Sequence, residues 1–235
     1  MKKITFSFGG GAWLFPFYYG VAHYIATHLK NRNDPNIRFC GLSVCTPLVT
    51  ALASGTMDLR DMYKKCLRAY PRCKNNPFAM TKAGFQVAYE NVPDDDWFKN
   101  VSRLLFGVSE VTRSGLKAKN ISSFKDRKHA LQIMYASAHI PVIGGILPTC
   151  IDGSWYYDGT LTQNHTCLPV FGDEDTVVYI TACNKPHQKG YITPGTSFPF
   201  LWQIFPPSVE VLDGMFNIGY QRAEEFFSDW TEYFT

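Results

Sequence analysis

The sequence predicts a three-layer α/β fold, in which helices cover both faces of a mostly parallel central sheet. Apolar runs of strand length alternate with helix-length segments over most of the chain, and this order is typical of parallel sheets. The chain has 235 residues, of which 46% are hydrophobic. That length and composition fit one sizeable core, so residues 1–235 are predicted to form a single domain.

The N-terminal quarter is expected to contain two strands and two helices. Residues 3–8 predict a short buried strand, and residues 16–29 predict a helix with a proline in its first turn. A second strand is predicted at residues 37–40. Residues 46–54 follow as a helix, and Gly55 is placed to end it.

The rest of the chain continues the alternation with one irregular interval. Helices are predicted at residues 58–70, 129–137 and 208–234, and Ser208 is the expected cap of the last one. Strands are predicted at residues 104–111, 121–124, 151–157 and 176–181. Residues 71–96 are rich in Asn, Pro and Lys, so a cap or an irregular excursion is expected there.

The first candidate for chemistry is a serine between a predicted strand and a predicted helix, in Gly41-Leu42-Ser43-Val44-Cys45. A nucleophile elbow places its serine on such a sharp turn, so that the hydroxyl stands clear of the sheet. Gly41 lets the backbone turn tightly, and the N-terminus of the following helix favours a developing oxyanion. An ordinary strand-to-helix turn has the same local pattern, and Cys45 replaces the last glycine of G-x-S-x-G.

Two further short patterns can carry chemistry. Gly9-Gly10-Gly11 follows the first strand, and three glycines let backbone N–H groups approach a ligand, as an oxyanion hole or a phosphate cradle requires. A plain tight turn explains the run equally well, and it does not match the G-x-x-x-x-G-K-[ST] pattern of nucleotide-binding loops. Asp158-Gly159 follows a strand-like segment, and this pair is also common in simple turns.

Together and in this order, the three patterns resemble the patatin-like phospholipase family over nearly the whole chain. The glycine run resembles the family's oxyanion loop, Ser43 lies in a segment similar to its elbow, and Asp158-Gly159 resembles its D-G-[GA] motif. Ala136-Ser137-Ala138-His139-Ile140-Pro141 resembles its A-S-x-x-I-P segment. The adiponutrin-like branch, which acts on acylglycerols, phospholipids or retinyl esters, is indicated by Phe17-Tyr18-Tyr19-Gly20-Val21-Ala22, Val92-Pro93-Asp94-Asp95 and Phe205-Pro206-Pro207-Ser208.

The resemblance implies a lipid acyl hydrolase, either a phospholipase A or an acylglycerol lipase, that uses a Ser–Asp dyad and no cofactor. Ser43 would attack the ester carbonyl, Asp158 would take its proton, and an acyl-enzyme would form. The amides of Gly10 and Gly11, with that of Val44 as an extra donor, would hold the oxyanion. A lipid alcohol in place of water would make the same site a transacylase. The glycines that the resemblance gives a supporting role are Gly9, Gly41 and Gly159.

Departures from the family pattern keep other interpretations open. Val44 and Cys45 add bulk at the elbow, so a catalytically weak or inactive lipid-binding protein of the same fold is the alternative function. Trp13 stands where many family members carry a basic residue. A Ser–His–Asp triad is the rival mechanism, and His165 and His187 are its candidates because they follow the aspartate.

Composition limits the partners and the compartment. The formal charge of +3 is small, so nucleic acid is not an expected partner. The seven cysteines are scattered without the spacing of a metal site, so no metal site is expected. We expect the cysteines to be reduced thiols and the protein to be cytoplasmic. No stretch predicts a signal peptide or a membrane span.

Peripheral contact with a membrane or lipid droplet stays open, beside the expected lipid ester substrate. The basic run over residues 64–74 fits an anionic membrane surface, and it fits a solvated helix face as well. The aromatic segment Phe198-Pro199-Phe200-Leu201-Trp202 suits a bilayer interface, and burial under the last helix explains it equally well.

Overall fold

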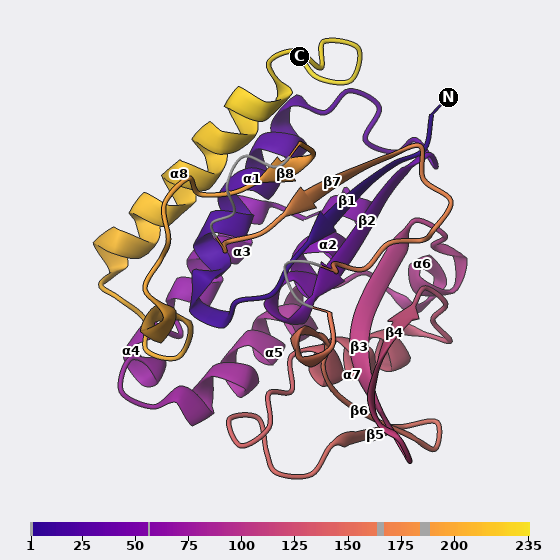
Figure 1. The fold of residues 1–235 in the computed structure, drawn as a ribbon, viewed down its shortest axis with the longest axis vertical. Coiled ribbons are helices and arrows are strands. Elements are labelled where there is room, and N and C mark those ends of the chain that lie inside the picture. Colours follow the sequence, from indigo (N-terminus) through magenta and orange to yellow (C-terminus); the bar gives the residue numbers. More distant parts are fainter. Residues whose placement is uncertain (1, 56, 164–166, 184–188) are drawn as a thin grey trace.

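The computed structural model describes residues 2–55, 57–163, 167–183 and 189–235, and in these ranges an eight-stranded mixed sheet is flanked by helices (Figure 1). The strand order is β5-β6-β3-β2-β1-β7-β8, and β4 also pairs with β3. The strands are β1 (Ile4–Phe8), β2 (Ile37–Leu42), β3 (Leu104–Thr112), β4 (Gly115–Ile121), β5 (Thr149–Ile151), β6 (Ser154–Asp158), β7 (Thr176–Ile180) and β8 (Tyr191–Ile192).

The pairings confirm the predicted α/β class. The run β3-β2-β1-β7-β8 is parallel throughout, whereas β3–β4, β3–β6 and β5–β6 are antiparallel. Parallel strands meet at one edge with their carboxyl ends, so β1 and β2 deliver the segments that follow them to the same place. The glycine loop follows β1 and Ser43 follows β2.

The helices follow the predicted order. They are α1 (Phe15–His28), α2 (Thr46–Ser54), α3 (Leu59–Leu67), α4 (Tyr70–Cys73), α5 (Met80–Asn91), α6 (Asp95–Asn100), α7 (Arg127–Ser137) and α8 (Val209–Phe227). Short 3₁₀ helices are η1 (Ala12–Leu14), η2 (Ser43–Cys45), η3 (Pro77–Ala79), η4 (Gly159–Leu161) and η5 (Phe200–Gln203). Gly55 ends α2 in the left-handed conformation, as predicted.

Four predicted elements differ in the structure. Residues 71–96 are largely helical, because the side chains of Asn76 and Asp94 cap helix starts instead of interrupting them. The strand expected at 121–124 is wrong, since the hairpin partner of β3 ends at Ile121. Residues 151–157 form two strands, because Asp152 and Gly153 both adopt positive φ in a two-residue turn. The last helix stops at Phe227.

Opposite faces of the sheet have different covers. Along β1, Phe6 packs against Phe39 and against Phe227 of α8. Ser7, the next residue, points the other way and donates a hydrogen bond to the carbonyl of Pro169. Helix α8 and the segment 167–175 therefore lie over opposite faces, and Figure 1 shows that segment crossing the strands in front of the helices.

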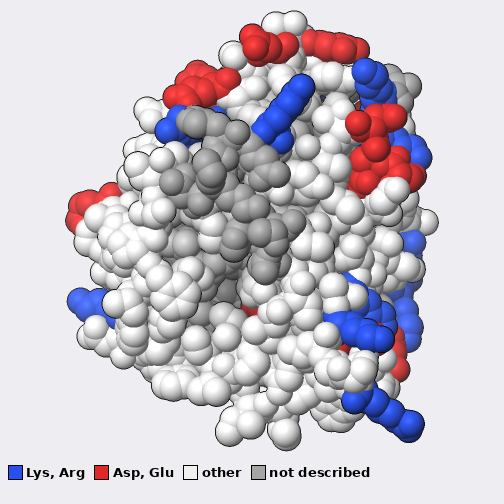
Figure 2. Space-filling view, in the orientation of Figure 1, with Lys and Arg blue, Asp and Glu red and all other residues white. Residues whose placement is uncertain are grey.

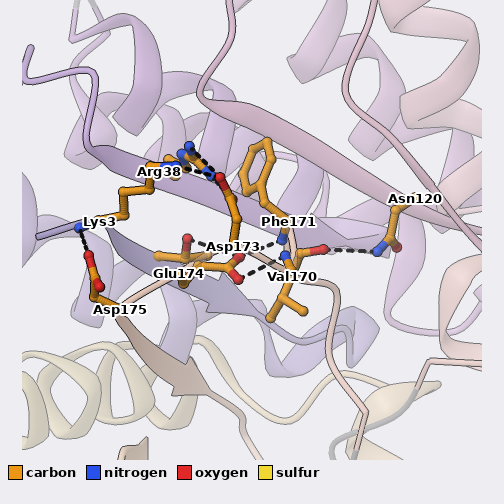
Figure 3. Close-up of polar contacts among 10 residues, drawn as sticks. Lys3, Arg38, Asn120, Val170, Phe171, Asp173, Glu174 and Asp175 are labelled. Carbon is orange, nitrogen blue, oxygen red and sulfur yellow. Dashed lines mark hydrogen bonds and ion pairs between the residues drawn. The ribbon is translucent and has the colours of Figure 1, made fainter.

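Acidic side chains fix the segment 169–175 across the sheet (Figure 3). Asp173 accepts from Lys3 Nζ at 2.5 Å and also pairs with Arg38. These two cations lower the pKa of Asp173 to about 2. The Arg38 guanidinium lies 4.8 Å from the centre of the Phe171 ring, a cation–π contact. The contacts tie the chain that leaves η4 back onto β1 and β2, the strands that lead to the glycine loop and Ser43.

Helices α1 and α8 cross at unusually short distance. A Cβ atom on Gly219 would lie 2.1 Å from the carbonyl oxygen of Phe17, and one on Gly20 would lie 2.0 Å from that of Phe216. Glycine on both sides therefore lets the two backbones touch. Because α1 follows the glycine loop, this crossing also fixes where the loop can lie.

Replacing Gly219 by Ala is expected to destabilise the fold by about 1–3 kcal/mol, because the new methyl group must push the helices apart. Gly214 lies on the same helix, and a Cβ atom there would meet no described atom within 4 Å, so Gly214→Ala should stabilise by up to about 1 kcal/mol. Urea unfolding followed by circular dichroism measures both. Equal effects of the two substitutions would contradict the tight crossing.

Candidate functional site

Ser43 sits on a strained turn between β2 and α2. Its φ is 50°, a left-handed value that non-glycine residues adopt rarely and at a cost in backbone strain. The backbone N–H of Ser43 donates to Ser137 Oγ at 2.8 Å, and Ser137 Oγ donates to the carbonyl of Gly107 at 2.7 Å. This relay from α7 and β3 holds the serine backbone in its unusual conformation.

Asp158 ends β6 and meets Ser43 directly. Ser43 Oγ donates a hydrogen bond to Asp158 Oδ2 at 2.7 Å, and both residues are buried. The other carboxylate oxygen, Oδ1, accepts from the backbone N–H of Thr160 at 2.8 Å and from its hydroxyl at 2.6 Å. Asp158 N–H in turn donates to the carbonyl of His139. Thr160 thus fixes the carboxylate through Oδ1, and Oδ2 faces the Ser43 hydroxyl.

The environment of Asp158 suits a base at neutral pH. Burial disfavours its charged form and raises the pKa to about 6, against the lowering effect of the hydrogen bonds from Thr160 and Ser43. Above pH 6 the carboxylate is mostly ionised, and its affinity for a proton exceeds that of an ordinary aspartate. A neighbouring serine hydroxyl can therefore pass its proton to Asp158.

The glycine loop lies against this pair. A Cβ atom on Gly10 would lie 2.3 Å from Thr160 Cγ2 and 3.0 Å from Ser43 Cβ, so a side chain has no room there. Gly9 N–H donates to Ile180, and Tyr18 Oη donates to the carbonyl of Gly10. Within the described ranges, the N–H groups of Gly10 and Gly11 have no acceptor. Two unused donors beside a serine hydroxyl can hold an anion.

The packing around the other predicted site residues leaves no room for a side chain at Gly41 and Gly159. A Cβ on Gly41 would lie 2.7 Å from Val49 Cγ2, and one on Gly159 would lie 2.4 Å from the carbonyl oxygen of Gly107. Cys45 is buried, and burial raises the pKa of its thiol well above the usual value. The added bulk of Val44 and Cys45 leaves Ser43 within hydrogen-bond distance of Asp158. Val44 N–H lies in the first turn of η2, where helical N–H groups lack helical acceptors.

An apolar cavity of about 100 Å³ opens beside Ser43. Among the described residues its wall holds no charged side chain, and α5 supplies the largest share of it, with η1, α1, η2, α2 and α7 around it. Residues of the interval 71–96, for which the sequence predicts no definite element, supply much of it. Apolar residues of the wall include Phe15, Val44, Met80, Phe85, Val87, Met134 and Ile140.

The described histidines do not join the Ser43–Asp158 pair. His139 hydrogen-bonds Thr149 and Gly145 through its ring, and His129 pairs with Asp152. His23 and His28 contact rings of α8. The candidates for a triad, His165 and His187, lie outside the described residues. Over the described ranges, no cluster of three His, Cys, Asp or Glu side chains is placed to hold a metal ion.

Two residues of the site have no role that the sequence predicts. Ser137 stands out only as part of the A-S-x-x-I-P segment, and Thr160 only as a residue after Asp158-Gly159. The signal for both is the motif itself. Their functions depend on contacts across the sheet, between β3, β6, α7 and the turn after β2, which no local spacing reveals.

Comparison with known proteins adds distant relatives. The chain is 24% identical over 248 residues to patatin-like phospholipase domain-containing protein 2 of Homo sapiens, covering 96% of this chain and 48% of that protein. It is 22% identical to omega-hydroxyceramide transacylase of Mus musculus, covering 69% of this chain and 28% of that protein. The chain thus spans about half or less of these relatives.

The fold also has a solved counterpart. The crystal structure of VipD from Legionella pneumophila superposes with a TM-score of 0.54 at 11% identity, covering 97% of this chain and 67% of that one. That identity supports a shared fold alone. No family model matches the chain.

Proposed function

Because the chain resembles the patatin-like family in sequence and in fold, we propose that it is a lipid acyl hydrolase with Ser43 as nucleophile and Asp158 as base. One observation carries the proposal: the 2.7 Å hydrogen bond from Ser43 Oγ to a buried carboxylate. Beside it lie an apolar cavity and two glycine N–H groups that have no acceptor among the described residues. The reaction is hydrolysis of a phospholipid or acylglycerol ester. The adiponutrin-like branch stays a prediction.

The geometry suggests the following steps. Ser43 Oγ attacks the ester carbonyl carbon while its proton moves to Asp158 Oδ2, and the carbonyl oxygen becomes an oxyanion. The N–H groups of Gly10, Gly11 and Val44 donate to that oxygen. Asp158 returns the proton to the leaving alcohol, which leaves an acyl group on Ser43. Water, deprotonated by Asp158, then releases the fatty acid and restores the serine.

The backbone N–H groups at the elbow have different proposed roles. The N–H of Ser43 is occupied by Ser137 Oγ, so it does not donate to the oxyanion. The next amide along the chain, that of Val44, is the donor that a nucleophile elbow ordinarily supplies. Thr160 acts on Asp158 alone and is a positioning residue.

Purified protein should release fatty acid from phosphatidylcholine vesicles or from triolein emulsions, and should cleave 4-nitrophenyl butyrate. Mass spectrometry of the released acid measures the first two and absorbance measures the third. Folded protein that cleaves none of the three would contradict the proposed activity. That result would favour the alternative, an inactive lipid-binding protein of the same fold.

Transacylation is a second candidate, favoured by the mouse relative, which is named a transacylase. The same Ser43 acyl-enzyme would then react with a lipid alcohol instead of water. Adding a long-chain alcohol to the assay distinguishes the two, because transacylation yields a new ester in place of free acid.

Lipid substrates reside in membranes or droplets, and exposed apolar side chains offer a way to meet them. Phe200 and Leu201 of η5 are 70% and 63% exposed, whereas Phe198 and Trp202 of the same segment pack against the core. The segment lies against η1, directly after the glycine loop. Ile146 and Leu147 are exposed in the loop between α7 and β5. Figure 2 shows few charged side chains over the lower centre of this face, between these two segments.

We therefore propose peripheral contact with a lipid surface through η5 and the loop before β5. In flotation assays with phosphatidylcholine vesicles, the double variant Phe200→Ser/Leu201→Ser should bind at least about threefold less than wild type, since two large apolar side chains no longer enter the interface. Leu116→Ser, an exposed residue on the β4 hairpin, is the matched control and should bind as wild type does. Equal binding by all three proteins would rule out this surface.

The helices in the described ranges include none that is long and apolar enough to cross a membrane. A cytoplasmic location is part of the proposal, since all seven cysteines stand as free thiols. Cell fractionation that recovered the protein from the secreted medium would overturn it.

A further inference from the structure

Gly84 lies in the middle of the side of α5 that faces the cavity beside Ser43. The residues of α5 that line the cavity are Met80, Thr81, Ala83, Gly84, Phe85, Val87 and Ala88. At about 3.6 residues per turn these positions surround Gly84 on one side of the helix. The opposite side carries Lys82, Gln86 and Glu90, which are exposed and do not line the cavity. A side chain at position 84 would therefore point into the cavity.

No described side chain or backbone fills the space in front of Gly84. A Cβ atom there would meet no atom of another part of the described chain within 4 Å. Gly84 is itself exposed, whereas Val87 and Ala88 on the same side of α5 are only 8% and 1% exposed. Because Gly84 lines the cavity, this open space belongs to the cavity.

The packing of α5 does not explain a glycine at this position. Glycine is, after proline, the least favourable residue in a helix interior. At the crossing of α1 and α8 the close approach requires it, since a Cβ atom on Gly20 or Gly219 would lie 2.0 or 2.1 Å from a backbone oxygen. Gly84 has no such contact among the described residues. What a side chain at position 84 would change is the cavity.

We propose that Gly84 sets the length of acyl chain that the cavity accepts, because the space in front of it receives the part of the chain that extends beyond Ser43. This inference rests on the proposed function, since it takes the cavity as the place of the acyl group that Ser43 receives. A cavity of about 100 Å³ takes up a short acyl chain or the first carbons of a longer one. A larger side chain at position 84 would occupy part of that space, so substrates with more acyl carbons would lose apolar contacts there.

A comparison of acyl-chain lengths tests the inference. The measurement is kcat/KM for 4-nitrophenyl hexanoate and for 4-nitrophenyl acetate, and the readout is the ratio of the two. In wild type the ratio should be at least about ten, because the longer chain places more apolar surface in the cavity. Gly84→Leu should lower the ratio at least about fivefold, and Gly84→Ala, which adds one methyl group, should lower it about twofold.

Gly214→Leu is the matched control, because Gly214 is a helix glycine with equally open space at its Cβ position but lies on α8, outside the cavity. It should keep the wild-type ratio, and circular dichroism checks that each variant is folded. A wild-type ratio at or below one would overturn the inference. So would a folded Gly84→Leu protein with the wild-type ratio or, where that variant does not fold, a Gly84→Ala protein with the wild-type ratio.

A binding measurement separates this inference from the proposed activity. Calorimetric titration of Ser43→Ala protein with methyl hexanoate needs no turnover. Binding that is at least about fivefold weaker in Ser43→Ala/Gly84→Leu, and unchanged in Ser43→Ala/Gly214→Leu, supports the inference even if no ester is cleaved. Equal dissociation constants for the three proteins, or no binding by any of them, contradict it even if esters are cleaved.

Discussion

Ser43→Ala is expected to lower kcat for 4-nitrophenyl butyrate by at least about 10⁴-fold, because the acyl-enzyme loses its only attachment point. The fold should survive, since the serine backbone keeps its hydrogen bond to Ser137 and only the Oγ contact with Asp158 disappears. Hydrolysis assays measure the first effect, and circular dichroism checks the second.

The matched control is Ser109→Ala, which removes another buried serine hydroxyl close to Asp158. Ser109 Oγ donates to the backbone carbonyl of Asp158 at 2.7 Å and does not contact the carboxylate oxygens. Its loss should lower stability by about 1 kcal/mol and reduce activity far less than Ser43→Ala does. Similar activity losses in both variants would indicate that Ser43 supports structure rather than reaction.

Asp158→Asn is expected to show opposite effects on activity and on stability. Hydrolysis should fall by about 10³–10⁴-fold, since the amide cannot take the serine proton. The free energy of unfolding at pH 8 should rise by about 1–3 kcal/mol, because the variant no longer carries a charge in a fully buried position.

The sign follows from the raised pKa of Asp158. A carboxyl group with a folded pKa of about 6 against an ordinary value of 3.8 stabilises the fold most below pH 3.8, and that stabilisation is lost as pH rises through 6. Asparagine does not titrate, so the stability of Asp158→Asn relative to wild type should increase as pH rises from 4 to 6. Near pH 4 this difference in stability should vanish. Urea unfolding at several pH values measures it.

Asp152→Asn is the control, because Asp152 is exposed and its pKa is lowered by Lys125. That variant should gain no stability at pH 8. If Asp158→Asn were as stable as wild type at every pH, the carboxylate would not have a raised pKa. If it kept wild-type activity, Asp158 would not be the base.

The sequence could predict those elements that local patterns of apolar, capping and turn residues define. Alternating apolar strands and capped helices located β1, α1, β2, α2, β3 and α7 within a few residues. The order of the glycine loop, Ser43 and Asp158 resembles that of the patatin-like family, and this resemblance implies the candidate dyad. The glycine loop and Ser43 are adjacent because the parallel strands β1 and β2 end at one edge, whereas Asp158 reaches them from the antiparallel strand β6, where it pairs with Val108 of β3.

The rest depends on contacts between distant segments. The amphipathic character of α5 is evident only where its apolar residues form the cavity wall together with residues of η1, α1 and α7. The roles of Ser137 and Thr160 arise from hydrogen bonds across the sheet. Neither Cys45 nor Val44 could be judged by size alone, because the packing around η2 decides whether their bulk moves the serine.

Fluorophosphonate labelling followed by peptide mapping tests the Ser43–Asp158 dyad, because the reagent bonds covalently to a serine activated by a base. Wild type should give one adduct, on Ser43, that forms more slowly as pH falls below about 6 and is absent from Ser43→Ala. Asp158→Asn should prevent labelling, whereas His165→Ala and His187→Ala should label as wild type does. Folded wild type that stays unlabelled, or labelling that requires either histidine, would contradict a Ser43–Asp158 dyad.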